Sequence, residues 1–323
     1  MPRDWIHCYV AEQCAAILRE WSPSVADCLE HWRMGAVFPD AGFYMPYLLL
    51  HRTGSAGHMF AHDLHGSDGQ DPNLLFRALR KAWRKEHHLT DLAFLFGCAT
   101  HFLTDVVFHP FVYYHTGNYY DKALSDRRDS VYRHRLLETL MDFYLVESRK
   151  YQAPRLKEHW KMVEPSIRWV CTALEQSSLN YPEETFQPHL YQSMKLACRL
   201  NSTFSNPWML KPVGVLRHLA PRNRSLALFY VPSLRQHLSL LQGRLLYLNP
   251  VTGEPFQCSF DDLLERAIKE SVAYCKDALW PYLEAETDEL PPMPSLDFGL
   301  VGARYRRAVH FAEKPLTAAI EQV

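Results

Sequence analysis

The stretch 92–114 constrains this chain more than any other feature, because it is the most apolar part of the sequence. It is interrupted by three polar groups, His101, Asp105 and His109, and each of them would be costly in a lipid environment. We therefore expect a long buried core helix over 90–108 rather than a transmembrane segment.

The three polar groups follow a helical spacing. In the segment THFLTDVVFHP, His101, Asp105 and His109 stand at positions i, i+4 and i+8. Steps of four residues keep them along one face of a helix. Burying three titratable groups on an apolar face is expensive unless they are paired or bind a metal. A core histidine with a single Asp–His hydrogen bond is the simpler alternative, but three such groups on one face favour a metal site.

The next expected helix carries a second pair, His134 and Glu138, again four residues apart. Its inward face would otherwise be apolar, with Val131, Met141 and Leu145 on the same stripe. A histidine and a glutamate at this spacing can hold a zinc ion from two sides. An ordinary helical ion pair, worth a few tenths of a kcal/mol, is the alternative.

Further candidate ligands lie upstream. Asp40 stands in the segment FPDAGFYMP, and His7 lies near the start of the chain. A histidine-rich loop region adds His51, His58, His62 and His65. Histidines in loops are often merely solvated. Nitrogen and oxygen ligands without cysteine suit zinc, and also iron or manganese. Clustered ions bridged by an aspartate suit attack at phosphorus.

Composition excludes several classes of protein. The 323 residues carry a net charge of −1, so no stable complex with nucleic acid is expected. The eight cysteines form no C-x-x-C pair, which disfavours a disulfide framework or a cysteine-based zinc finger. No glycine-rich phosphate-binding motif occurs. The N-terminus lacks the pattern of a secretory signal, so we expect a cytoplasmic protein.

Helical periodicity dominates the chain, and the predicted fold class is all-α, a multi-helix bundle with a metal cluster in its core. Irregular structure is expected over 38–70, and a polar loop over 113–128. Pro110 is expected to place His109 near the end of its helix. We predict a metal-binding helical domain over 1–150. Residues 151–323 would form a further helical region of unknown role, packed on the first.

The order of these motifs resembles a known family. The pattern H…PD…H…H-x-x-x-D-x-x-x-H…H-x-x-x-E is similar to that of the zinc-dependent phospholipases C. This family is related in fold to the single-strand-specific zinc nucleases. The matching motifs span 5–144, and H-x-x-x-D-x-x-x-H followed by H-x-x-x-E is the most specific part.

The resemblance implies three zinc sites. The first would use Asp40, a loop histidine, His101 and Asp105. We choose His58 for the loop, because GHMF is closest to the family's segment, with His62 as the second choice. His109, His134 and Glu138 would hold the second ion. His7 would hold the third, with Asp105 as a bridge. In secreted members the N-terminal amine completes the third site, whereas here Met1 to Ile6 precede His7, so two or three ions are expected.

The resemblance also implies a function. We expect a zinc-dependent hydrolase of phosphoric esters, with a phospholipid or another phosphodiester as substrate. A metal-bound hydroxide would attack phosphorus, and Asp40 would act as general base. Two alternatives remain open: an HD-type phosphohydrolase built on His62, Asp63 and Asp105, and a non-catalytic helical binding or scaffold protein with a structural metal site. The oligomeric state is not predicted.

Overall fold

The structure is a computed structural model. It describes residues 4–44, 56–177, 186–204, 230, 232–284 and 289–320. The side chains of residues 56–58, 186–187, 204, 232 and 319 lie outside this description as well.

The molecule is a bundle of helices built around one central helix, α7 (Leu89–Thr116). Every residue of α7 from Asp91 to Tyr113 is buried. By length and composition α7 could cross a membrane, but the 18 residues of its most apolar window are all buried inside the protein. The apolar stretch is therefore the core helix of the fold, as its sequence predicts.

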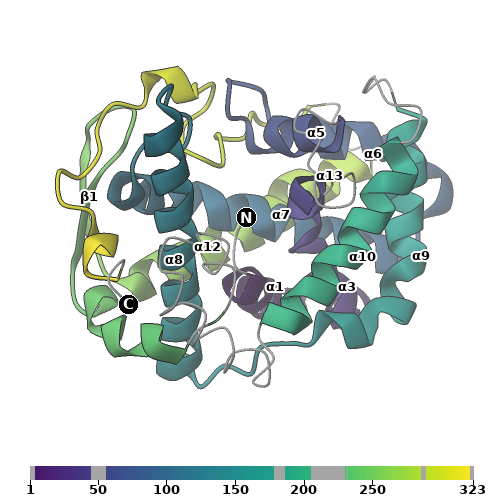
Figure 1. Ribbon diagram of the computed structural model, residues 1–323. Coiled ribbons are helices and arrows are strands. Elements are labelled where there is room, and N and C mark those ends of the chain that lie inside the picture. The colour runs from purple at the N-terminus through teal and green to yellow at the C-terminus, as the bar shows by residue number, and fades with distance from the viewer. Residues whose placement is uncertain are drawn as a thin grey trace.

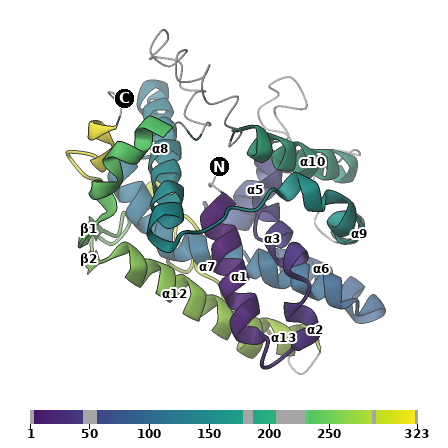
Figure 2. The same cartoon turned by 90° about the horizontal axis from the view of Figure 1, so that it is seen from below.

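The other helices pack around α7 or on its neighbours (Figures 1 and 2). Those of the first half are α1 (Asp4–Leu18), α2 (Pro23–Ala26), α3 (Leu29–Gly35), the 3-10 helix η1 (Phe38–Tyr44), α5 (Ala56–His65), α6 (Leu74–Glu86) and α8 (Leu124–Arg149). Those of the second half are α9 (Leu156–Glu175), α10 (Phe186–Phe204), η3 (Pro232–Leu241), α12 (Phe260–Ala273), the π-helix η4 (Tyr274–Leu279), α13 (Trp280–Leu283), η5 (Tyr305–Arg307) and η6 (Leu316–Ala319). The all-α prediction is confirmed.

Two glycines allow α3 and α7 to touch backbone to backbone. A Cβ atom on Gly35 would lie 2.0 Å from the carbonyl oxygen of Phe94, and one on Gly97 would lie 2.2 Å from that of Trp32. Only glycine fits at such a crossing. The crossing matters for the site, because the end of α3 reaches α7 one helical turn before His101.

The expectation of irregular structure over 38–70 is wrong for much of that segment. Residues 38–44 form η1, and residues 56–65 form the regular helix α5. The glycines of this region suggest loops, but Phe60, Ala61, Leu64 and His65 are all buried and share one helical face. Gly66 then ends α5 with φ of +62°, the left-handed conformation common after a helix.

The central helix also continues further than its proline suggests. Pro110 lies inside α7, which ends only at Thr116, so the polar loop is confined to 117–123. A proline cannot donate to the carbonyl four residues earlier, here that of Val106. Gly299 packs there instead: a Cβ on it would lie 2.8 Å from the Val106 oxygen. Tertiary packing thus accommodates the interrupted helical ladder, and His109 stays in helical geometry.

The second half packs closely on the first. Buried side chains from both halves belong to one hydrophobic cluster, and the rings of Phe108 and Phe260 lie 5.5 Å apart. Helix α12 begins with a capping box in which Ser259 and Asp262 bond each other's backbone N–H groups, as their spacing indicates. Strands β1 (Leu245–Leu248) and β2 (Pro255–Cys258) form an antiparallel hairpin beside α7.

Candidate metal centre

Asp105 lies at the centre of the candidate site, on α7. Its Oδ1 atom is 3.3 Å from His7 Nε2 and 3.4 Å from His109 Nε2. Its Oδ2 atom is 3.2 Å from His101 Nε2 and 3.6 Å from His65 Nε2. The two oxygens of one buried carboxylate therefore face different pairs of histidines. This is the arrangement expected of a carboxylate that bridges two ions.

The first cluster consists of Asp40, His65 and His101, and it faces Asp105 Oδ2. Its potential ligand atoms lie within 4.8 Å of one another. Asp40 Oδ1 is 3.3 Å from His65 Nε2 and 3.9 Å from His101 Nε2. η1, α5 and α7 each contribute one of these residues, so the cluster joins three elements.

The second cluster consists of His109, His134 and Glu138, from α7 and α8. Glu138 Oε1 is 2.9 Å from His134 Nε2 and 3.6 Å from His109 Nε2. All three side chains are buried, so the stripe on α8 faces the core as its spacing predicts.

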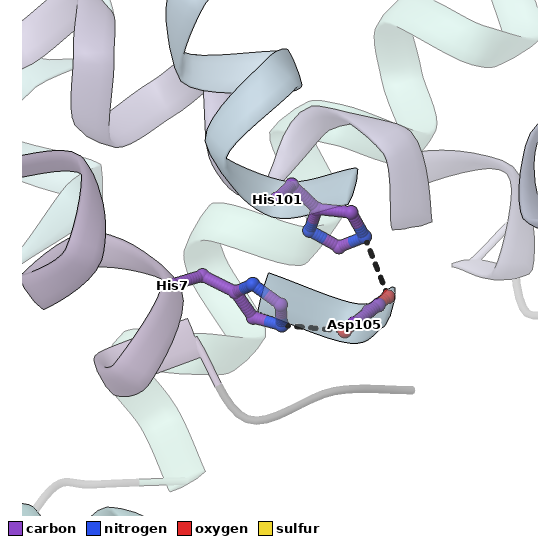
Figure 3. A group of neighbouring side chains, drawn as sticks. All are labelled: His7, His101 and Asp105. Carbon is purple, nitrogen blue, oxygen red and sulfur yellow. Dashed lines mark ion pairs between the residues drawn. The ribbon is translucent and has the colours of Figure 1, made fainter. Parts of the chain in front are cut away.

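The third cluster consists of His7, His101 and Asp105, and Figure 3 shows the three side chains converging from α1 and α7. The rings of His7 and His101 are stacked with their centroids 4.2 Å apart. The backbone N–H groups just before His7 donate hydrogen bonds to Asp142 and not to the cluster. The N–H of Ile6 donates to Asp142 Oδ1 at 3.0 Å, and that of Trp5 faces Asp142 Oδ2 at 3.4 Å. The acidic side chain thereby satisfies the first turn of α1.

The buried charges make the site strongly electrostatic. Burial lowers the pKa of His7 to about 4. Burial would also lower the pKa of His109, but Asp105 and Glu138 outweigh burial and raise it to about 9. Burial alone would raise the pKa of Glu138, yet His134 and His109 hold it well below its usual range. These carboxylates thus stay ionised and face nitrogen atoms, as the ligands of a cation do.

Unsatisfied atoms indicate that a cation fits the site. Among the described residues, these buried atoms lack a hydrogen-bond partner: Asp40 Oδ1, His101 Nε2, Asp105 Oδ2, His109 Nε2 and Glu138 Oε2. Buried polar atoms are nearly always satisfied, and an ion is one explanation for those that are not. An all-nitrogen and oxygen set of imidazoles and carboxylates is what zinc prefers when cysteine is absent. The residues present therefore fit zinc.

Two of the imidazoles are oriented by backbone carbonyls. His101 Nδ1 lies 2.8 Å from Ala36 O, just after the α3–α7 crossing, and His65 Nδ1 lies 2.7 Å from Ala61 O. A hydrogen bond at Nδ1 fixes the tautomer that leaves Nε2 free for a metal. Both Nε2 atoms face the first cluster.

The structure brings together seven of the eight residues predicted as ligands: His7, Asp40, His101, Asp105, His109, His134 and Glu138. The eighth, His58, has a side chain outside the described residues. His65 stands in the first cluster. The sequence alone presents it as one of several loop histidines. Helical spacing is the sequence pattern that could have identified His65, because it follows Ala61 by four residues on the buried face of α5. Which of these residues bind metal stays a prediction.

The HD-type alternative needs His62 and Asp63 beside Asp105. None of the three clusters in the described part of the chain contains either residue. Asp63 Oδ1 instead accepts a hydrogen bond from Gln70 Nε2 at 3.1 Å. The ring of His62 packs against Phe43, with centroids 5.4 Å apart. The geometry thus favours the three clusters over an HD site.

The fold and the site define a helical protein with three clusters of possible metal ligands in its described core. The family model described as zinc-dependent phospholipase C matches residues 6–187 of the chain. The chain belongs to the zinc-dependent phospholipase C family. The match begins in α1 and extends past the motifs of α7 and α8 into α10. No curated protein and no solved structure matches the chain.

Proposed function

We propose that the protein is a zinc-dependent phosphodiesterase that hydrolyses a phospholipid or a similar phosphodiester. The observation that carries the proposal is the position of Asp105, whose two oxygens face separate histidines between the first and second clusters. Bound zinc would lower the pKa of a coordinated water and stabilise negative charge on phosphate oxygens. A cytoplasmic location stays a prediction.

A small cavity of about 20 Å³ lies beside the clusters. One part of its lining consists of potential metal ligands: His7, Asp105, His109 and Glu138. The rest is mainly apolar: Ile6, Phe108, Val112 and Met141, with Thr104. A cavity of this size has room for about one water molecule, so it supports a water placed at the ligands. The choice of a phospholipid as substrate rests on the family match.

Asp40 is our candidate general base, as the family resemblance implies. Its carboxyl group is 4% exposed, and its Oδ1 atom points to His65 and His101 in the first cluster. An ionised carboxylate at this place can bind an ion through one oxygen and accept a proton from an attacking water. Both roles need the carboxylate, so its amide analogue would lose the proton-accepting role.

We propose that two ions bind tightly and that the third cluster binds weakly. His101 and Asp105 already face the first cluster, so among the described residues His7 is the one group that the third cluster does not share. The nearby N–H groups of Trp5 and Ile6 are directed to Asp142, and peptide N–H groups are not zinc ligands. A site with so few ligands of its own retains an ion poorly.

The test is zinc analysis and turnover by protein purified without chelator or a histidine tag. We expect about two tightly bound zinc equivalents, and hydrolysis of phosphatidylcholine micelles or of bis(p-nitrophenyl) phosphate. His101→Ala and Glu138→Ala should each lose part of the zinc and nearly all turnover. His31→Ala is the matched control, because His31 is buried but belongs to none of the three clusters.

The outcomes separate the function from its alternatives. Folded protein that binds no zinc would contradict the metal centre. Tightly bound zinc without turnover of any phosphodiester would favour a structural metal site in a binding protein. Zinc loss in His31→Ala equal to that in His101→Ala would show that the clusters are not the site.

A further inference from the structure

A C-terminal strap, residues 295–305, lies against one residue of the first cluster, His65, and one of the second, His109. It lies outside residues 6–187, which the family model matches. The strap is anchored to the end of α5: the N–H of Leu296 donates to His65 O at 2.9 Å, and Ser295 Oγ donates to the same oxygen at 3.3 Å. Further along, Tyr305 N–H donates to Ser67 O at 2.9 Å. A first-cluster histidine is therefore held in place by a remote segment.

The strap brings one acidic side chain into the core. Asp297 is 2% exposed, and its Oδ1 atom lies 3.9 Å from His109 Nδ1. Nδ1 lies on the other side of the imidazole ring from Nε2. The Nε2 atom points to Asp105 and to Glu138, which belongs to the second cluster. Among the described residues, His109 Nδ1 has no hydrogen-bond partner. Asp297 is thus placed on the outer side of a candidate metal ligand.

Two tyrosine hydroxyls hold the carboxyl group in this place. Tyr113 donates to Asp297 Oδ1 at 3.0 Å, and Tyr120 donates to Oδ2 at 2.7 Å. Tyr113 lies one helical turn after His109 on α7. Burial and the charge of Asp297 raise the pKa of both phenols, so they remain protonated donors. The position of Asp297 is therefore set by α7 as well as by the strap.

We propose that Asp297 is a positioning residue for zinc in the second cluster. A carboxylate beyond the Nδ1 atom of a ligating histidine orients the ring and strengthens Nε2 as a ligand. For His65 and His101 a backbone carbonyl has this place, whereas His109 Nδ1 faces the carboxylate of the strap at 3.9 Å. The inference deepens the proposed function and rests on the metal centre binding zinc.

The test is competition for zinc between the full-length protein and a chromophoric chelator. Asp297→Asn keeps the shape of the side chain and removes its charge. We expect it to weaken one zinc equivalent by about 10- to 100-fold and to leave the other unchanged. The weakened equivalent should be the one that Glu138→Ala removes. With Co²⁺ in place of zinc, the visible spectrum of that equivalent should change.

Matched variants separate positioning from general support of the fold. Asp91→Asn changes another buried carboxyl group on α7, far from the second cluster, and should alter neither equivalent. In a His109→Ala background, Asp297→Asn should have no further effect on zinc, because it acts through that ring. If Asp297→Asn does not fold, the double variant Tyr113→Phe/Tyr120→Phe keeps the carboxyl group, and it should weaken the same equivalent.

Three results would overturn the inference. Unchanged affinity and an unchanged Co²⁺ spectrum in Asp297→Asn would show that the carboxylate does not act on the site. Equal weakening of both equivalents would make the strap a general support of the fold. A further loss of affinity in the His109→Ala background would show that Asp297 acts through another group. Wild-type protein that binds no zinc would contradict the proposed function itself.

Discussion

The first and third clusters share His101 and face the same Asp105, yet their surroundings differ. In the first cluster, Asp40 and His65 add two more ligand atoms, and backbone carbonyls orient both imidazoles. In the third cluster, His7 is the one added group, and the nearby backbone N–H groups are directed to Asp142. The difference teaches how many ligand atoms each cluster has of its own, and we therefore expect the first cluster to retain an ion more tightly than the third.

Replacing Asp105, which lies between the clusters, should have the largest effect. Asp105→Asn removes the charge of the bridge and one acceptor oxygen. The third cluster thereby loses its carboxylate, and the first and second clusters lose the carboxylate that they face. We expect at least one zinc equivalent to be lost. Turnover should fall by about a thousandfold. This corresponds to a loss of about 4 kcal/mol of charge stabilisation in the transition state, because each 1.36 kcal/mol is about tenfold in rate. Zinc analysis and initial rates check this, and unchanged turnover would contradict a bridging role.

Replacing Asp142, which accepts hydrogen bonds from the start of α1, tests the comparison between the first and third clusters. Asp142→Ala would leave the N–H of Ile6 and the hydroxyl of Tyr230 without this acceptor. Such buried groups cost about 1–3 kcal/mol when unsatisfied, so we expect a loss of about 3 kcal/mol in the free energy of unfolding. Urea denaturation measures this. The two tight zinc equivalents should persist, and loss of one of them would show that the third cluster holds a tight ion.

Widening the crossing of α3 and α7 should have the smallest effect. Gly97→Ala places a methyl group against the Trp32 carbonyl, and overpacking of this kind costs about 1–3 kcal/mol. The shift would move Ala36 O away from His101 Nδ1 and weaken zinc in the first cluster but not in the second. Chelator competition reads both equivalents. The zinc equivalent of the second cluster is the internal control, because that cluster consists of His109, His134 and Glu138 and does not include His101.

Local spacing predicted the part of the site that two helices contribute. His101, Asp105 and His109 on α7, with His134 and Glu138 on α8, follow i, i+4 patterns that any helix brings to one face. His65 does not stand out in the sequence, because the glycines near it indicate a loop, whereas the structure has the short helix α5 there. Asp297 could not be predicted, since it reaches His109 through a strap without periodicity and through contacts across the chain.

The same limit applies to the fold. The buried helix, the capping box at Ser259 and the all-α class follow from local patterns. The continuation of α7 past Pro110 does not, because it depends on Gly299 packing against the carbonyl of Val106. The expected division of the chain at residue 150 stays a prediction, although side chains from both sides of it share one hydrophobic cluster.

The most direct test of the metal centre is anomalous X-ray diffraction at the zinc edge, from crystals of the protein purified without chelator. The account predicts two strong peaks, one among Asp40, His65, His101 and Asp105, and one among His109, His134 and Glu138. A peak beside His7 should be weaker. Peaks only at surface residues, or none in well-ordered crystals of active protein, would contradict a zinc centre in the core.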